Sequence, residues 1–344
     1  MTSLVAALEI LANGRSLTAN QAHRAVAAIM TGDASESLIA AFLTALRVRG
    51  ETADELAGAV AAVRIHSVGW PDATNLGPVL DTCGTGGDGA CTVNISTAAA
   101  IVVAATGVPV AKHGNRSASG NSGSAEVLVE LGVAVEAEPS ILVRSLRELG
   151  LTFLFAPKFH PALRFAAPVR RQLPFRTLFN LVGPLVNPAG PAFQLIGVPD
   201  PRLANLVAEA VARLGVTRAA VVTGSDGLDE VSLGGDTRVR WVEGGAVSHR
   251  TWRRADFGLD PVTPEQLRVA GPAESARAIR ELLAGQPGPV RSTVLANAAA
   301  ALLVAGAVVD LANGVERAAT AIDDGSAARL LTRWVALTNT PNPV

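Results

Sequence analysis

The first 75 residues show the periodicity of helices. Apolar side chains recur three and four positions apart, as in Leu38, Phe42, Ala45 and Leu46, which places them on one face of a helix. Residue pairs with the spacing of a capping box, a signal for a helix start, precede these runs. The three pairs are Thr18 with Gln21, Asp33 with Glu36, and Thr52 with Glu55. We therefore predict a small all-helical domain over residues 1–75.

From residue 76 onward, short apolar runs alternate with helical patterns. This alternation is typical of an α/β fold with a mostly parallel central sheet flanked by helices. We assign residues 76–344 to this larger domain, and we expect part of the irregular segment 165–190 to pack on the helical domain. A glycine pair at residues 244–245 predicts a hairpin. The expected strands are residues 78–82, 108–112, 133–136, 151–155, 193–198 and 218–223, and the expected helices are 94–106, 124–131, 140–149, 161–173 and 202–214.

Two glycine-rich loops follow the first two predicted strands. Residues 81–97 read DTCGTGGDGACTVNIST, and residues 112–126 read KHGNRSASGNSGSAE. Glycine lets a backbone approach a ligand closely, and amide groups at a helix N-terminus attract phosphate. Because ligands of parallel sheets bind at the carboxyl ends of the strands, both loops predict a site for a phosphorylated small molecule.

The first loop also matches the spacing of a dinucleotide-binding motif. Gly84, Gly86 and Gly89 satisfy G-x-G-x-x-G after a strand. That motif requires an acidic residue about 20 positions further on, at the end of the second strand, to bind a ribose hydroxyl. Lys112 and His113 stand there instead. The sequence therefore disfavours a nicotinamide cofactor.

Several polar residues near these loops have both a structural and a functional interpretation. Asn94, Ser96 and Thr97 open a helix, so they serve as N-caps or bind phosphate oxygens or a metal. The crowded charges from Lys112 to Arg116 form either a solvated loop or an anion site. Asp229 with Glu230 is either a solvated turn or a pair of Mg²⁺ ligands, and the phosphate loops favour the metal. The arginines of the irregular segment are surface charges, or one of them binds a carboxylate; they are Arg164, Arg170, Arg171 and Arg176.

Composition narrows the function classes. The 344 residues carry a formal net charge of −1, so no global positive field attracts nucleic acid, although a local basic patch stays open. Two cysteines and an N-terminus without the features of a signal peptide lead us to expect a cytoplasmic protein. The apolar run 294–312 contains Asn297, Gly306 and Asp310, which favours a buried helix pair over a membrane span.

Taken in order and spacing, the motifs GTGGD, NIST, KHGNR, VRR with NLVGPLVNP, and GLDEVS resemble those of the anthranilate phosphoribosyltransferases. The resemblance covers nearly the whole chain. It implies a Mg²⁺-dependent transfer of the phosphoribosyl group of phosphoribosyl pyrophosphate (PRPP) to the amine of anthranilate, in tryptophan biosynthesis. It also implies a helical domain joined to an α/β domain, an active site at the hinge between them, and a homodimer formed through the helical domain.

The resemblance assigns roles to individual residues. Ser96, Asp229 and Glu230 are expected to coordinate two magnesium ions, and Gly84, Asn115 and Arg170 to contact anthranilate. Lys112 is expected to stabilise the leaving pyrophosphate, and no residue is assigned as an acid or base because a neutral aromatic amine is already nucleophilic. The residues expected to bind PRPP are Gly84, Gly87, Asp88, Thr92, Asn94, Ile95, Ser96, Thr97, Lys112, His113, Gly114, Asn115, Arg116, Ser117, Ala118, Ser119, Gly120 and Ser124.

The chain departs from the family pattern in three places. Gly120 stands where serine is common, Glu126 where aspartate is common, and Val93 where phenylalanine is common.

Two alternative functions are disfavoured. A pyrimidine nucleoside phosphorylase would need a lysine in the glycine loop, and a nucleic-acid-binding paralogue would have a basic surface and lack GLDE. We therefore expect neither a nucleic-acid partner nor a membrane, while another aminobenzoate acceptor stays open.

Overall fold

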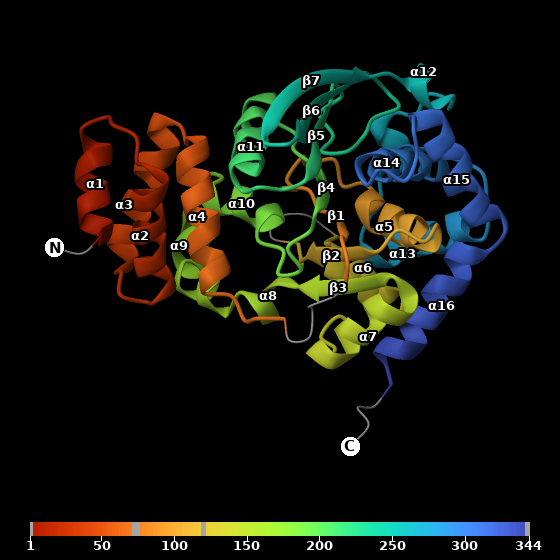
Figure 1. Ribbon diagram of the computed structural model, residues 1–344, viewed down its shortest axis with the longest axis horizontal. Coiled ribbons are helices and arrows are strands. Elements are labelled where there is room, and N and C mark those ends of the chain that lie inside the picture. Colours follow the sequence, from red (N-terminus) through yellow and green to blue (C-terminus); the bar gives the residue numbers. More distant parts are fainter. Residues whose placement is uncertain (1–2, 71–75, 118–121, 341–344) are drawn as a thin grey trace.

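The computed structural model describes residues 3–70, 76–117 and 122–340. A bundle of helices occupies one end of the molecule, and a larger body built around a central sheet occupies the other (Figure 1). This arrangement confirms the predicted fold class, a small helical domain with a larger α/β domain.

In the described part of the N-terminal domain, residues 3–70, four helices form a bundle, and their starts follow local capping chemistry. The side chains of Thr18 and Thr52 accept hydrogen bonds from the backbones of Gln21 and Glu55, as the capping boxes predict. The predicted box of Asp33 is wrong, because the side chain of Ser35 accepts the bond from the Leu38 amide instead. The helices are α1 Ser3–Ala12, α2 Ala19–Met30, α3 Glu36–Arg49 and α4 Ala53–Ile65.

Within the described residues, seven strands form one sheet in the order β3-β2-β1-β4-β5-β6-β7. Strands β1 to β5 pair in parallel, while β6 and β7 form the predicted antiparallel hairpin at one edge. The short strand β1 lies in the interior of the sheet, so the first glycine-rich loop leaves from between β2 and β4. The strands are β1 Leu80–Thr82, β2 Val110–Gly114, β3 Leu151–Phe155, β4 Phe193–Gly197, β5 Arg218–Gly224, β6 Thr237–Glu243 and β7 Ala246–Trp252.

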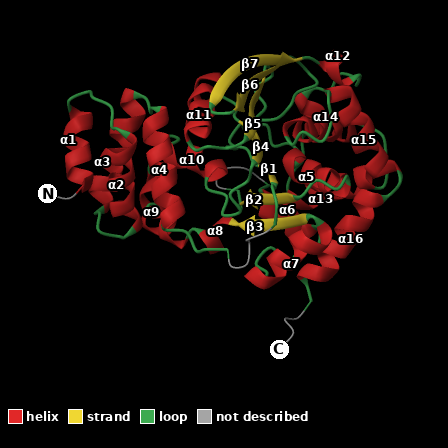
Figure 2. Cartoon of the chain, viewed as in Figure 1, coloured by secondary structure: helices red, strands yellow, loops and turns green. Residues whose placement is uncertain are grey.

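Helices cover both faces of this sheet (Figure 2). Successive strand residues point to opposite faces, so Leu195 packs in one core with α5 and α14, while Ile196 packs in another with α11 and the N-terminal bundle. The second core thus continues from the sheet into the bundle. The remaining helices are α5 Ile95–Ala105, α6 Ser124–Glu130, α7 Pro139–Leu149, α8 Ala156–Phe159, α9 Ala167–Gln172, α10 Leu178–Val182, α11 Pro201–Arg213, α12 Arg254–Phe257, α13 Pro272–Leu283, α14 Pro289–Val304, α15 Leu311–Asp323 and α16 Ser326–Thr338.

Two predicted elements are wrong. Residues 133–136 lie in the connection between α6 and α7, where only residues 135–136 form a turn; Val133 and Val135 alternate because they are buried in the core. The helix predicted over residues 161–173 is divided into a 3-10 helix, Pro161–Phe165, and α9, since Pro168 lies in the first turn of α9 and lacks an amide hydrogen.

The apolar C-terminal run forms part of the core. Helix α14 is buried along most of its length and packs against α5 and α15, as the prediction of a buried helix pair requires. Within the described residues, no helix is long and apolar enough to cross a membrane.

Candidate active site

The first glycine-rich loop runs from the end of β1 to the start of α5. Gly86, Gly87 and Gly89 have φ of 64°, 77° and 73°, in the left-handed region that glycine adopts without strain. A Cβ atom on Gly84 would lie 2.7 Å from Oδ2 of Asp229. The glycines therefore permit both the turn of the loop and its close approach to an acidic side chain from a distant segment.

The two acidic residues predicted as metal ligands contact this loop and the start of α5. The amide of Gly86 donates to Oδ2 of Asp229 at 2.9 Å, and the amide of Ser96 donates to Oε1 of Glu230 at 3.3 Å. Burial, followed by repulsion from Asp88, raises the pKa of Asp229 to about 7. Burial and the neighbouring Asp229 raise the pKa of Glu230 well above its ordinary value. A bound cation would relieve the cost of keeping both groups ionised.

These residues fit a hard divalent cation that also binds substrate phosphates. They supply carboxylate and hydroxyl oxygens, the ligands that Mg²⁺ prefers, and Mg²⁺ commonly takes one or two carboxylates from the protein. In the part of the chain that the structure describes, no group of three or more His, Cys, Asp or Glu side chains could hold a metal by itself. Phosphate oxygens would therefore have to complete the coordination.

Lys112 lies on β2 and connects the second loop to the first. Its side chain is buried and donates to the carbonyl of Thr82 and, at 3.2 Å, to Oγ of Ser96. The ammonium group thus sits beside one predicted metal ligand, Ser96, and partly offsets the rise that burial and Asp229 cause in the pKa of another, Glu230. A buried cation at this position can stabilise negative charge on a leaving group.

The N-terminus of α5 is held by side chains from two other segments. Oδ1 of Asn94 accepts hydrogen bonds from Ser122 at 2.8 Å and from Ser275 of α13 at 2.9 Å, so Asn94 does not cap its own helix. The amides of Ile95, Ser96 and Thr97 are all hydrogen-bonded within the protein. The predicted capture of phosphate by these amides would therefore require the loop to rearrange. The hydroxyl of Thr97, in contrast, is buried and has no hydrogen-bond partner among the described residues.

The second loop is closed by Glu126, whose carboxylate accepts hydrogen bonds from the amides of Ser117 and Gly123 at 3.1 and 3.0 Å. The carbonyl of Asn115 accepts from the Ser124 hydroxyl at 3.2 Å. The exposed guanidinium of Arg116 pairs with Glu136 at 3.3 Å. Three residues predicted to bind PRPP lie outside the described residues: Ala118, Ser119 and Gly120.

His113 is buried behind the second loop. Its amide donates to Asp81 at 3.1 Å, and its Nδ1 lies 3.1 Å from the carbonyl of Gly183. Burial and the neighbouring His160 lower the pKa of His113 to about 3. The ring is therefore neutral near pH 7 and can position other groups, but it contributes no positive charge to an anion site.

Comparisons with known proteins match this architecture. Residues 5–67 match the helical bundle domain of a glycosyl transferase family, and residues 76–328 match the a/b domain of the same family. Anthranilate phosphoribosyltransferase of Thermomicrobium roseum is 49% identical over 336 residues, which cover 96% of each chain. The chain belongs to the anthranilate phosphoribosyltransferase family.

Solved structures of the family agree. The crystal structure of anthranilate phosphoribosyltransferase from Thermus thermophilus has a TM-score of 0.91 and 40% identity, and the match covers 99% of this chain and 100% of that one. The enzyme from Saccharomyces cerevisiae in complex with PRPP and Mg has a TM-score of 0.87 and 28% identity, with 97% of each chain covered. A second structure of that yeast enzyme is a complex with 4-fluoroanthranilate.

Two arginines of the irregular segment, Arg170 and Arg176, differ in their contacts. Arg170, expected to bind anthranilate from the resemblance to anthranilate phosphoribosyltransferases, lies on α9 with its guanidinium 5.8 Å from the ring centre of Phe179. Among the described residues it forms no hydrogen bond or ion pair with either glycine-rich loop. Arg176 donates directly to the first loop. Nothing in the sequence distinguished Arg176 from its neighbours.

Other residues predicted to bind PRPP form contacts within the protein. The side chain of Asp88 accepts a hydrogen bond from the Ala90 amide of its own loop at 3.0 Å, and Thr92 forms an isolated antiparallel β-bridge with Arg268. Gly114 ends β2, and a Cβ atom there would lie 2.3 Å from the Ser124 hydroxyl oxygen. These predicted contacts with PRPP stay predictions.

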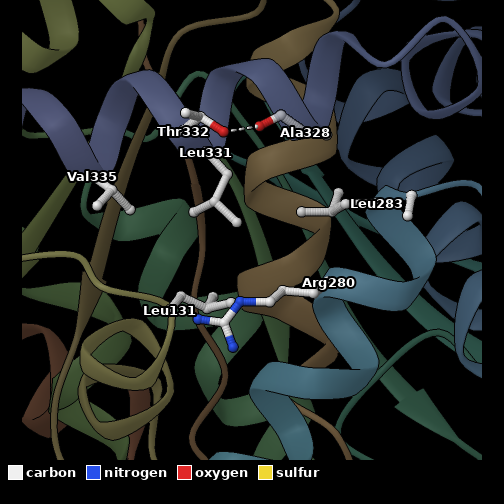
Figure 3. Close-up of a pocket in the computed structure, with 8 residues that line it drawn as sticks. Leu131, Arg280, Leu283, Ala328, Leu331, Thr332 and Val335 are labelled. Atoms are coloured by element: carbon white, nitrogen blue, oxygen red, sulfur yellow. Dashed lines mark hydrogen bonds between the residues drawn. The ribbon is translucent and has the colours of Figure 1, made fainter.

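A depression of about 350 Å³ lies elsewhere, between the residue that follows α6, the C-terminal part of α13 and one side of α16. Its lining is mainly apolar, and the guanidinium of Arg280 is engaged with the carbonyl of Glu130 at 2.6 Å. The Thr332 hydroxyl donates to the carbonyl of Ala328 within α16 (Figure 3). None of the described residues predicted for PRPP, metal or anthranilate lines it, so the polar site at the glycine-rich loops is the candidate active site.

Proposed function

We propose that this chain transfers the phosphoribosyl group of PRPP to the amine of anthranilate, giving N-(5-phosphoribosyl)anthranilate and pyrophosphate in tryptophan biosynthesis. The observation that carries the proposal is the convergence of Ser96, Lys112, Asp229 and Glu230 on the first glycine-rich loop. Full-length similarity to anthranilate phosphoribosyltransferases supports it. The yeast complexes with PRPP and Mg and with 4-fluoroanthranilate support both substrates and the cation.

The residues suit a displacement at C1 of the ribose. The amine nitrogen forms the new bond to C1 while the bond from C1 to the pyrophosphate oxygen breaks. Lys112 holds a positive charge beside that oxygen, and the loops fix the two reactants in line. A bound Mg²⁺ would add neutralisation of the developing negative charge. No general base is needed, since the aromatic amine attacks in its neutral form and loses its proton to water afterwards.

The finer parts of the proposal concern stoichiometry, assembly and location. We infer two magnesium ions per subunit, held by Ser96, Asp229 and Glu230 with PRPP oxygens. We also infer a homodimer formed through the helical domain. The helical domain comprises residues 1–75, and the α/β domain comprises residues 76–344. A cytoplasmic location is consistent with the two free cysteines, Cys83 and Cys91.

The direct test follows the loss of anthranilate fluorescence with purified protein, PRPP and Mg²⁺. We expect consumption that requires both PRPP and the metal. A panel of other aminobenzoates under the same conditions tests acceptor choice. Absence of turnover with every acceptor, at saturating PRPP and Mg²⁺, would overturn the proposed function.

The substitution Arg170→Ala tests the anthranilate site. A guanidinium binds a carboxylate through two charge-assisted hydrogen bonds, so we expect the KM for anthranilate to rise about tenfold or more and the KM for PRPP to change little. Arg171→Ala is the matched control, because Arg171 is the exposed next residue of the same helix. A larger change in the KM for PRPP would reject the carboxylate role.

A further inference from the structure

Arg176 reaches from the segment between α9 and α10 to the first glycine-rich loop. Its two terminal nitrogens donate to successive backbone carbonyls, to Gly86 at 2.5 Å and to Thr85 at 2.9 Å. These partners lie about ninety positions earlier in the sequence. The guanidinium therefore holds the loop from the side of the helical bundle.

The peptide unit between Thr85 and Gly86 is held at both ends. Its carbonyl accepts from Arg176 at 2.9 Å, and its amide donates to Oδ2 of Asp229 at 2.9 Å. The preceding amide, of Thr85, donates to the carbonyl of Gly197 at 2.8 Å. A peptide fixed in this way presents its amide to Asp229 in one orientation, so Arg176 and Asp229 act on each other through a single rigid group.

The contact depends on the shape of a guanidinium. Its planar fork can bind two neighbouring carbonyls at once, which a lysine ammonium on a flexible stem cannot do with the same geometry. A Cβ atom on Gly87 would lie 2.3 Å from a terminal nitrogen of Arg176, so glycine is needed there for the arginine to reach the backbone.

We propose that Arg176 is a positioning residue that orients the first glycine-rich loop and, through the Gly86 amide, the Asp229 carboxylate for metal and pyrophosphate. The proposal rests on the proposed function and adds to it a link between the arginine-rich segment and the metal ligands. It assigns Arg176 to the PRPP and Mg²⁺ half of the site, in contrast to Arg170, which is assigned to the anthranilate half.

The experiment compares Arg176→Ala, Arg176→Lys and the control Arg171→Ala with the wild type. For Arg176→Ala we expect the KM for PRPP and the Mg²⁺ concentration for half-maximal rate each to rise about tenfold or more, since two charge-assisted hydrogen bonds are lost. The KM for anthranilate should stay within about twofold of the wild-type value, because Arg176 contacts the first glycine-rich loop and sites without shared contacts act independently. Arg176→Lys should recover little, and millimolar guanidinium chloride should restore part of the rate of Arg176→Ala alone.

Three results would overturn the proposal: equal effects on PRPP and anthranilate, full activity in Arg176→Lys, or an unchanged dependence on Mg²⁺. If Arg176→Ala does not fold, Arg176→Gln, which keeps one donor, undergoes the same test. Calorimetric titration of the protein with PRPP and Mg²⁺ measures binding without turnover, so it tests the role of Arg176 independently of the proposed reaction. A wild type that binds PRPP with Mg²⁺ but does not consume anthranilate contradicts the proposed function, while weaker binding by Arg176→Ala still supports the role of Arg176.

Discussion

Replacing Asp229 with asparagine and Glu230 with glutamine together is expected to lower kcat/KM by about 10³-fold, while the protein remains folded. The metal that these carboxylates would hold contributes several kcal/mol to stabilising the transition state, and each factor of ten corresponds to about 1.4 kcal/mol. The side-chain amides of asparagine and glutamine have the size of the carboxyl groups and keep an acceptor oxygen. The backbone N–H groups of Gly86 and Ser96 therefore keep their acceptors.

The stability of this double variant should change in the opposite direction from its activity. Both carboxyl groups have a pKa raised by burial. In metal-free protein the contribution of Asp229 is therefore fully present below about pH 4 and is lost as the pH rises through its raised pKa of about 7, and the raised pKa of Glu230 acts in the same direction. The variant should lose this dependence on pH and should unfold at an equal or higher temperature than the metal-free wild type at pH 8.

The measurements are steady-state rates over a Mg²⁺ titration and thermal unfolding at pH 5 and pH 8. Asp260→Asn, a change in an exposed carboxylate, is the control and should leave both measurements as they are in the wild type. A double variant that retains its rate and its response to Mg²⁺ would refute the assignment of Asp229 and Glu230 as metal ligands.

The sequence predicts the parts of this site that depend on local chemistry. Glycine with positive φ, helix starts and alternating strands leave local patterns, so both loops and the α/β architecture could be assigned before the structure. Contacts across the fold leave no such pattern. Ser275 reaches Asn94 from 181 positions away, and Arg176 reaches Thr85 from 91 positions away. Each belongs to a residue type that is common on protein surfaces.

Local patterns also misled where two explanations share one pattern. Val133 and Val135 alternate as a strand would, yet they are buried beside α6 without pairing to the sheet. Asp33 has the spacing of a capping box, but Ser35 lies nearer the start of α3 and supplies the cap. Tertiary packing determined the structure in the first case, and a competing neighbour determined the cap in the second. The spacing of the residues alone indicates neither.

The motif NLVGPLVNP gains a physical explanation from the structure. Three successive carbonyls accept side-chain donors from three elements: Gly183 from His113 of β2, Pro184 from Gln194 of β4, and Leu185 from Arg64 of α4. Asn187 adds a bond to the buried Asp81 at 2.8 Å. The segment therefore joins the helical bundle to the strand that carries Lys112 and His113, which explains why the bundle bears on the geometry of the site.

Lys112→Met is expected to reduce kcat by about 10²- to 10³-fold, the usual loss when a group that stabilises developing negative charge is removed. Methionine keeps the aliphatic length of lysine but removes the ammonium group that now contacts Thr82 and Ser96. Because the charge of the leaving pyrophosphate grows as the bond to C1 breaks, the lost interaction is strongest in the transition state. The KM values should therefore change less than kcat.

The chain offers a matched control in its other lysine, Lys158. Its ammonium group lies on α8 and contacts the carbonyl of Glu136 at 2.6 Å, outside both glycine-rich loops, so Lys158→Met should retain the wild-type kcat. Single-turnover rates at saturating PRPP and Mg²⁺ would separate bond breaking from product release. A rise in the KM for PRPP with an unchanged single-turnover rate would show that Lys112 binds the ground state and the transition state equally, since such an interaction leaves the chemical step unaltered.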